Sequence, residues 1–314
     1  LFDANDNTLN KIYSDLHEGY RSSSIVKDPD QNIWYATHSG LFRRNSHILT
    51  FSESSTDMVN GLHTISEDNQ GKIWFGGYNQ SGWSYWDGQR LKRPDDQNLL
   101  SNQVLPGSFS DNGKIWFFEE AFDARNLSYL QKDRLRIISF PAEVSPGYYF
   151  KKLSSGKMAA GLAGKGLLIF DPEKPADFTI KNKDNGLLLQ NVLTISEDNH
   201  NRLWLGRMSQ GVACFDPVTD TIVTWLVSTE NPKSLGMIAS KTDIRGDLWM
   251  GTSKGLYILS KPHRFDILKQ SLFDHIEYIP LAGDYHDRVN SIAESSKYLI
   301  AGSDKGLHLI DKSA

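Results

Sequence analysis

The sequence predicts an all-β protein made of one repeated, four-stranded antiparallel unit. A tryptophan follows a polar turn and recurs along the chain at intervals of 40 to 51 residues. It stands in runs such as IWFGG, LWLG and LWMG, and Met158 and Ile300 take its place in two units. A glycine (once an asparagine) followed by an apolar residue recurs seven times, once after each of these positions. Two independent markers in phase indicate seven copies of the unit.

Each unit contains three short apolar runs separated by turns, and a weaker fourth run follows. Residues 191–217 show this clearly, with VLTIS, LWLG and VACF divided by SEDNHNR and SQG. TIVTW then supplies a fourth run, as RLRIIS does in the third unit. Runs of this length between Asn, Asp and Gly turns are typical of an antiparallel meander. Four strands in a unit of roughly 40–50 residues predict a seven-bladed β-propeller of four-stranded antiparallel blades.

We expect the propeller to occupy residues 1–314 as a single domain. The last unit stops after its third strand, whereas residues 8–15 precede the first unit and have no unit of their own. Pairing residues 8–15 with residues 306–311 supplies the missing outer strand. This pairing joins the two ends of the chain and removes an open sheet edge.

The repeated residues themselves are explained by packing. In a propeller each sheet packs against two others, so its middle strands are apolar on both faces. The tryptophan fills the wedge between blades, and the glycine two residues later lets a neighbouring backbone approach. The Asp of the preceding turn accepts hydrogen bonds from its own downstream backbone. Function is therefore expected in the residues that do not repeat.

Composition narrows the function classes. The 34 Lys and Arg against 38 Asp and Glu give a net charge of −4, and no basic run indicates a nucleic-acid partner. No apolar stretch is long enough to span a bilayer, so no direct membrane insertion is expected. The single cysteine, Cys214, excludes an internal disulfide and lies in an apolar run, as a core residue does. The chain begins at Leu1, and we expect a mature or excised fragment.

The repeated pattern I-x-E-D-x-x-G-x-(I/L)-W-x-G-x-x-x-G-(L/V)-x-x-(F/W)-D resembles the two-component-regulator propeller repeat. Residues 64–87 and 194–216 match best, and the other units match in part. The resemblance implies the exported sensor region of a hybrid two-component system, hence a periplasmic or extracytoplasmic, non-enzymatic domain that often senses carbohydrates. The family defines no catalytic residues, and we expect no cofactor. Any homodimer is expected to form through the parent protein.

Candidate ligand-binding residues lie in the loops joining second to third strands and in the segments that lead into first strands. These two groups share one face of a propeller, and they mix aromatic, amide and charged side chains that suit a polar small molecule or a glycan. Arg207 and Tyr78 are the first choices. Arg207 replaces a small residue of the sister units, and Tyr78 could stack on a sugar face. The other candidates are His38, Asn79, Glu119, Glu120, Tyr148, Tyr149 and Arg288.

Two local features can be explained either by function or by structure alone. The third unit breaks the loop pattern with FFEEAFDARN, so its charges could carry specificity or belong to a tolerated insertion. His263, His275 and His286 lie among carboxylates in what reads as the longest stretch between blades. Their spacing matches no compact metal-ligand motif, so no metal site is predicted.

Two other function classes remain open. A propeller lyase like the streptogramin-inactivating enzymes needs a His base and a metal-binding carboxylate on one face. His38 or His63 with Glu119 or Glu120 could supply them. A third hypothesis is a protein-interaction scaffold of the WD40 kind, although the WD dipeptide and the Gly-His start are missing.

Overall fold

The structure is a computed structural model, and strands account for most of what it describes. It describes residues 2–3, 8–9, 22–27, 33–37, 40–44, 48–51, 62–77, 82–95, 103–111, 113–121, 124–132, 134–138, 147–230, 234–281, 287–295 and 298–312. The helices within these ranges are single 3₁₀ turns: η1 (Lys183–Asn185), η2 (Pro262–Arg264) and η3 (Leu272–Asp274). The predicted all-β class is confirmed.

The first three sheets follow the predicted meander, each with four antiparallel strands in chain order. Sheet 1 comprises β3 (Ser22–Lys27), β4 (Ile33–Thr37), β5 (Gly40–Arg44) and β6 (Ile48–Phe51). Sheet 2 comprises β7 (Leu62–Glu67), β8 (Ile73–Gly77), β9 (Trp83–Trp86) and β10 (Leu91–Lys92). Sheet 3 comprises β11 (Gln103–Asp111), β12 (Lys114–Ala121), β13 (Ala124–Gln131) and β14 (Arg134–Ile138).

The next three sheets have the same order, and the chain closes with a shorter one. Sheet 4 comprises β15 (Gly147–Lys152), β16 (Met158–Leu162), β17 (Gly166–Asp171) and β18 (Lys174–Lys181). Sheet 5 comprises β19 (Thr194–Glu197), β20 (Leu203–Arg207), β21 (Gly211–Asp216) and β22 (Thr221–Leu226). Sheet 6 comprises β23 (Met237–Thr242), β24 (Leu248–Thr252), β25 (Gly255–Leu259) and β26 (Glu277–Ile279). The terminal sheet comprises β27 (Val289–Glu294), β28 (Tyr298–Ser303) and β29 (Gly306–Asp311).

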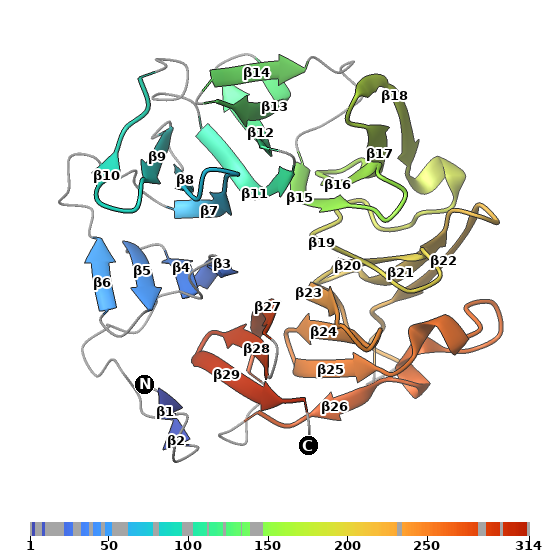
Figure 1. The fold of residues 1–314 in the computed structure, drawn as a ribbon. Coiled ribbons are helices and arrows are strands. Elements are labelled where there is room, and N and C mark those ends of the chain that lie inside the picture. Colours follow the sequence, from blue (N-terminus) through green and yellow to red (C-terminus); the bar gives the residue numbers. More distant parts are fainter. Residues whose placement is uncertain are drawn as a thin grey trace.

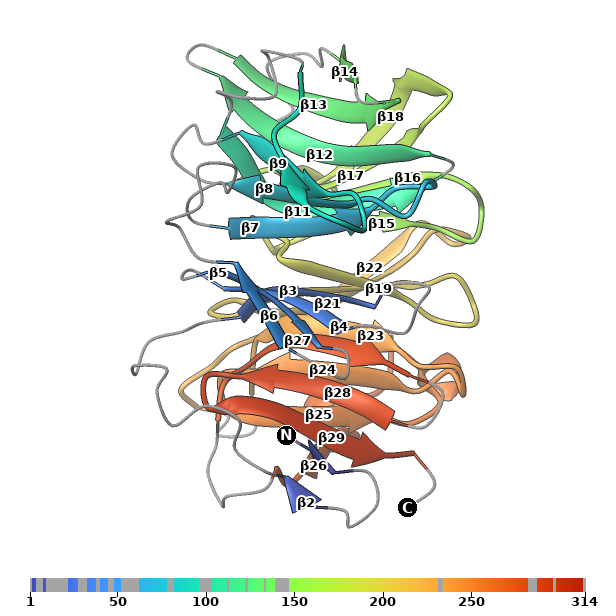
Figure 2. The same cartoon turned by 60° about the vertical axis from the view of Figure 1, so that its left-hand side comes forward.

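The sheets form a ring with their first strands innermost, which is the arrangement of a β-propeller (Figure 1). Each innermost strand contacts the innermost strand of the next sheet, and β27 contacts β3, so the ring closes. Figure 2 shows the sheets stacked face to face around it. The prediction of seven four-stranded blades is confirmed in part. Among the described residues, six blades have four strands and the terminal sheet has three.

The N-terminal residues form a small ribbon of their own outside the ring (Figure 1). β1 (Phe2–Asp3) pairs antiparallel with β2 (Thr8–Leu9). Among the described residues, β29 pairs with β28 on one side and has no strand on the other. The expected pairing of residues 8–15 with the terminal sheet is therefore not seen, and because residues 10–15 lie outside the described ranges it stays a prediction.

The core lies between neighbouring sheets and explains why the middle strands do not alternate. β8, β16 and β24 are buried at all five positions. One apolar cluster joins sheets 5 and 6, where Trp204 and Cys214 meet Met237 and Phe265. Cys214 is fully buried, and burial raises the pKa of its thiol, so the predicted core role is confirmed.

The glycine two residues after the tryptophan has the predicted function. A Cβ on Gly206 would stand 2.6 Å from the backbone oxygen and the Cβ of Met237 in the next sheet. Gly161 meets the carbonyl of Val192 in the same way, at 2.1 Å. The next innermost strand can approach only because these positions lack a side chain.

The Asp of each described Asp-Trp unit has a second acceptor function that the sequence did not reveal. One oxygen of Asp198 accepts backbone N–H groups of His200 and Arg202, as expected for such a turn. Its other oxygen accepts the indole N–H of Trp204 at 3.0 Å. The same indole bond recurs from Trp74 to Asp68 at 2.9 Å and from Trp249 to Asp243 at 3.0 Å.

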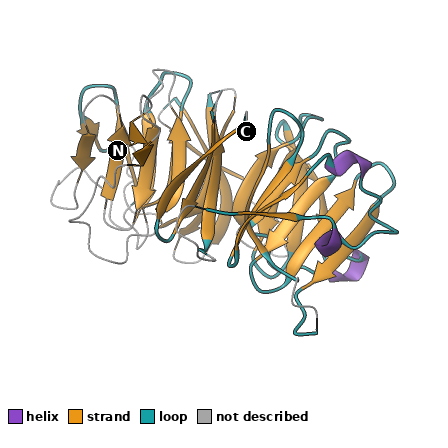
Figure 3. Cartoon of the chain, turned by 90° about the horizontal axis from the view of Figure 1, so that it is seen from below, coloured by secondary structure: helices purple, strands orange, loops and turns teal. Residues whose placement is uncertain are grey.

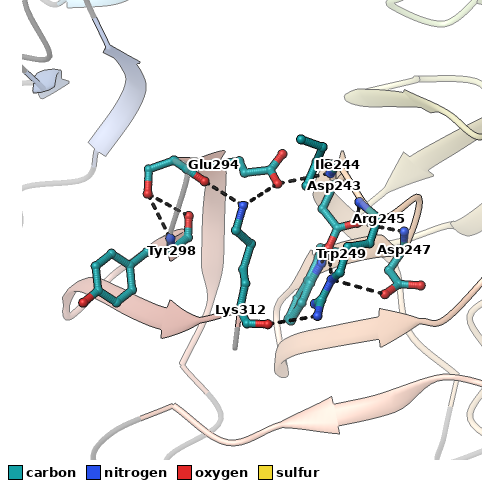
Figure 4. Close-up of polar contacts among 9 residues, drawn as sticks. Asp243, Ile244, Arg245, Asp247, Trp249, Glu294, Tyr298 and Lys312 are labelled. Carbon is teal, nitrogen blue, oxygen red and sulfur yellow. Dashed lines mark hydrogen bonds and ion pairs between the residues drawn. The ribbon is translucent and has the colours of Figure 1, made fainter. Parts of the chain in front are cut away.

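The Asp turn of sheet 6 also holds the end of the chain (Figure 4). Glu294 of β27 accepts the backbone N–H of Ile244 at 3.1 Å and the ammonium of Lys312 at 2.9 Å. Arg245 donates to the backbone carbonyl of Lys312 at 3.0 Å. The side chains of Glu294 and Lys312 are only 14% and 10% exposed. These contacts attach the terminal sheet to sheet 6.

Two sequence assignments need correction. The register pairs Ala159 with Lys151, as it pairs Trp204 with Ser196 and Trp249 with Lys241. Ala159, not Met158, therefore takes the tryptophan position in sheet 4. The stretch with His263 and His275 is not between blades, because β26 follows it as the fourth strand of sheet 6.

Candidate ligand-binding loop face

The turns between second and third strands and the segments leading into first strands lie at one end of the strands. We call this end the loop face; its described parts in sheets 4 to 6 and the terminal sheet are residues 163–166, 187–193, 207–210, 234–236, 253–254, 287–288 and 304–305. The opposite end, with the Asp turns and the turns between third and fourth strands, is the Asp-turn face. Seen from the edge, loops gather at both ends of the strands (Figure 3).

Hydrogen bonds fix the loop face between sheets 4 and 5. The backbone N–H of Gly166 donates to the carbonyl of Gln190 at 3.0 Å, and the N–H of Gly164 donates to the Asn191 side chain at 3.0 Å. The side-chain oxygen of Gln210 accepts the backbone N–H of Gln190 at 3.2 Å. The turns of both sheets are thereby attached to the same lead-in segment.

Similar contacts fix the other turns. Lys254 donates from its ammonium to the carbonyl of Ser234 at 3.0 Å. The backbone N–H of Asp304 donates to the carbonyl of Arg288 at 3.1 Å, and the Asn290 side chain donates to the Asp304 carboxylate at 2.7 Å. The loop face is therefore a preorganised rim, which lowers the ordering cost of binding.

Arg207 is the sequence-predicted candidate whose position is best defined. It is the last residue of β20 and is half-buried at the start of the turn to β21. A Cβ on Gly236 would stand 2.3 Å from its carbonyl oxygen, so the next lead-in segment packs directly on this turn. Among the described residues, the guanidinium has no hydrogen-bond or ion-pair partner. It is free to receive an anionic or carbonyl group.

Arg288 lies two sheets further round the same face. It is half-buried just before β27, and within the described part of the chain its Nε is buried without a hydrogen-bond partner. The preceding Asp287 is buried and accepts the Ser303 hydroxyl at 2.5 Å and the backbone N–H of Lys305 at 3.2 Å. Its carboxylate is thus occupied by the turn itself.

Ser303 and His308 complete a polar cluster with Asp287 but not a nucleophilic triad. Ser303 lies between the other two, with its hydroxyl 2.9 Å from Nε2 of His308. Burial lowers the pKa of His308, and the Asp287 carboxylate opposes that shift. Ser303 is 5% exposed and also bonds the Gly306 carbonyl, as Thr252 bonds Gly255 in sheet 6. The cluster caps a turn.

The remaining candidate residues lie in different parts of the structure. Tyr149 packs against the cluster between sheets 4 and 5, and burial raises the pKa of its hydroxyl. Tyr148 is its neighbour in β15. Glu119 and Glu120 lie in β12, paired with Asn126 and Arg125. The expected loop of the third unit is instead a hairpin of two eight-residue strands. His38, Tyr78 and Asn79 lie outside the described residues.

The described histidines do not form a metal set. His263 stacks on His200 at 5.3 Å, whereas His275 bonds the Ser271 carbonyl and packs on Phe265. Within the described ranges, no group of three or more His, Cys, Asp or Glu side chains is placed to hold a metal ion. The same ranges contain no helix long and apolar enough to cross a membrane.

The candidate set omitted three lysines that the loop face brings into prominence. Lys165, Lys254 and Lys305 each stand immediately before the glycine that opens a third strand. The signal in the sequence is the tripeptide Lys-Gly-Leu, which occurs at residues 165–167, 254–256 and 305–307. Lys254 and Lys305 belong to the loop ring that the sequence predicts, and Lys165 was interpreted as a turn residue, but none of the three is among the candidates named above.

Comparison with solved structures places this architecture among known propellers. The extracellular domain of the hybrid two-component system BT4673 from B. thetaiotaomicron superposes with a TM-score of 0.70 at 16% identity, over 93% of this chain and 38% of that one. The corresponding domain of BT3049 gives 0.67 at 19%, over 92% and 40%. The fold is that of the propeller in these extracellular sensor regions. The chain spans about two fifths of their length.

In a second group of structures, the shared fold covers nearly the whole of both chains. Catalytically inactive virginiamycin B lyase from Staphylococcus aureus, determined with quinupristin, gives a TM-score of 0.69 at 14% identity, over 94% of this chain and 97% of the lyase. At such identities both likenesses show the fold alone. No protein-family model and no curated protein matches the sequence.

Proposed function

We propose that the chain is a non-enzymatic, extracytoplasmic ligand-sensing domain of a two-component-type signalling protein. Its ligand is a carbohydrate or another polar molecule bound on the loop face. The observation that carries the proposal is Arg207, a half-buried guanidinium that has no described partner and that the repeat does not require. The fold of the extracellular sensor domains supports this role.

The blade bodies have little chemistry to contribute, because their repeated residues are buried in packing and in the Asp-indole bonds. The loop face gathers non-repeating side chains on turns that are already fixed by hydrogen bonds. Binding there needs little reorganisation, as a sensor with a defined ligand requires.

A glycan-array screen followed by calorimetry on the wild-type chain tests the proposal. Arg207→Ala is expected to lower affinity about tenfold or more, because it removes a charge-assisted hydrogen bond. Tyr78→Ala is expected to lower it by loss of stacking. Arg136→Ala, an exposed arginine on β14, serves as the matched control. Binding unchanged by both loop-face substitutions would place the site elsewhere.

A lyase is the second candidate, because the virginiamycin B lyase superposes over nearly the whole of both chains. Its chemistry would fall to His38 or His63 with Glu119 or Glu120, and those side chains lie outside the described set. Incubation with quinupristin and a divalent cation, followed by mass spectrometry, decides between the two. Metal-dependent ring opening would replace the sensor proposal.

A further inference from the structure

The loop face over sheets 4 to 6 and the terminal sheet carries a row of cations. Lys165, Lys254 and Lys305 are exposed in three of the four turns. Sheet 5 has Gln210 before its glycine but places Arg207 at the start of the same turn. Every described turn of this arc therefore presents one positive side chain.

The turn does not require these cations. Gln210 occupies the position of the lysines in sheet 5 and uses its side chain to accept a backbone N–H. What the turn requires is the following glycine, whose φ is +82° at Gly166, +115° at Gly255 and +138° at Gly306. The geometry of the turn therefore demands the glycine and not the lysine before it, although Lys254 also bonds the Ser234 carbonyl.

Acidic side chains on the loop face do not cancel this charge. Its residues as defined above contain five cations, namely Lys165, Arg207, Lys254, Arg288 and Lys305, and two carboxylates, Asp287 and Asp304. Asp287 is buried against Ser303, and Asp304 accepts the Asn290 side chain.

The rest of each segment between the fourth strand of one sheet and the first strand of the next adds little net charge. Lys183 and Asp184 are exposed side by side and offset each other, and Glu230 is exposed alone. Within the described part of the chain Lys165 has no ion-pair partner. The described residues of the arc are therefore net positive, whereas the whole chain has a net charge of −4.

The Asp-turn face carries both signs of charge. Its described turns hold the carboxylates of Asp171, Glu173, Asp198, Asp216, Asp220, Asp243 and Asp247, and the cations of Lys157, Lys174, Lys261, Arg264 and Lys312. Two of its arginines, Arg202 and Arg245, face Asp198 and Asp243. A ligand with negative groups therefore meets an excess of cations on the described loop face and mixed charges on the Asp-turn face.

We infer that the loop-face arc from Lys165 to Lys305 binds an oligosaccharide that carries carboxylate or sulfate groups. The inference rests on the proposed function and narrows its ligand class. Sheets that pack face to face are about 10 Å apart, so turns on successive sheets offer cations at that order of spacing. A linear chain with a repeated anionic unit matches such a row, and guanidinium and ammonium groups bind carboxylate and sulfate oxygens.

Calorimetry with three oligosaccharides of equal length tests the inference: one sulfated, one rich in uronic acids and one neutral. At least one anionic sugar is expected to bind about tenfold or more tightly than the neutral one. Its affinity is expected to fall steeply when sodium chloride is raised, since salt screens exposed charges.

Charge reversal locates the site. The double substitution Lys165→Glu with Lys305→Glu is expected to weaken binding of the anionic sugar about tenfold or more. Lys157→Glu changes another exposed lysine, on the Asp-turn face, and is expected to leave binding unchanged. Circular dichroism and thermal unfolding confirm that all variants fold.

The outcomes separate the inference from the proposed function. Tight binding of the neutral sugar, unaffected by the reversal, would overturn the inference and keep the sensor role. Equal binding of oligoglutamate or single-stranded DNA would also overturn it, because the arc would then be a general polyanion surface. Absence of binding by all three sugars would overturn the inference and contradict the carbohydrate form of the proposed function.

Discussion

The two ends of the propeller use charged residues for different purposes. On the Asp-turn face, Asp198 accepts two backbone N–H groups and an indole N–H, and its partner Trp204 is fully buried. On the loop face, Lys165 and Arg207 have no such partner among the described residues. Charges that repeat with the fold satisfy donors that the fold itself creates. The side chains of Lys165 and Arg207 are not used in this way, and we propose that they serve a ligand.

The Asp-turn face shows a further difference between two of its own units. Asp198 also faces the guanidinium of Arg202, whose side chain is 9% exposed and which donates to the carbonyls of Phe265 and Pro262. Asp243 faces Arg245, whose side chain is 49% exposed. The same turn is thus a buried ion pair in sheet 5 and a screened one in sheet 6.

Removing the indole should have the largest effect on stability. Trp204→Ala is expected to cost about 3–5 kcal/mol in the free energy of unfolding, the range for deleting a buried aromatic side chain. Guanidinium unfolding measures it, with Ile137→Ala, 54% exposed on β14, as the control. A loss below about 1 kcal/mol would mean that Trp204 is not wedged between sheets.

Removing the carboxylate is expected to destabilise the two Asp turns by different amounts. Asp198→Ala is expected to cost about 3–5 kcal/mol, because it leaves Arg202 buried without a counter-charge. Asp243→Ala is expected to cost about 1–3 kcal/mol, the penalty for unsatisfied hydrogen-bond donors alone. Both are measured by denaturant unfolding at neutral pH. Equal losses would contradict the distinction drawn between the two turns.

Lys151, near the Asp-turn end of β15, gives a pH-dependent effect. Burial lowers its pKa, the charge of Lys241 lowers it further, and Glu197 opposes both. The folded state disfavours the protonated form, so this cost is fully present below the folded-state pKa. It disappears as the pH rises from that value toward about 10.4, the pKa of an unfolded lysine.

Lys151→Met is therefore expected to stabilise the protein at pH 7 and to lose that advantage toward pH 10. Urea unfolding at the two pH values measures the change, and the exposed Lys157→Met variant gives the baseline. An advantage that is the same at both values would show that the charge of Lys151 carries no cost.

The smallest effect is expected on the loop face. Lys165→Glu should change the free energy of unfolding by no more than about 0.5 kcal/mol, because the side chain is exposed and unpaired within the described residues. Thermal unfolding measures it beside Lys157→Glu. A large loss would show that the loop-face cations have a structural role after all.

The repeat can be recognised from the order of the residues alone. The tryptophan, the glycine and the Asp turn recur at fixed spacing because each blade makes the same local demand on its residues. This spacing predicted the all-β propeller, the buried middle strands, the glycine contacts and the core position of Cys214. It also identified the loop ring, because alternating strand direction puts given turns at one end.

Three features depend on contacts between distant residues: the register of the strands, the number of strands in each sheet, and which turns share a face. A one-residue difference in register puts Ala159 rather than Met158 at the tryptophan position, and apolar runs alone do not fix it. The third strand of the terminal sheet has no described outer neighbour, because strand pairing depends on residues distant in sequence. The cationic arc joins Lys165 to Lys305 across 140 positions of sequence, and only the ring of sheets brings such turns onto one face.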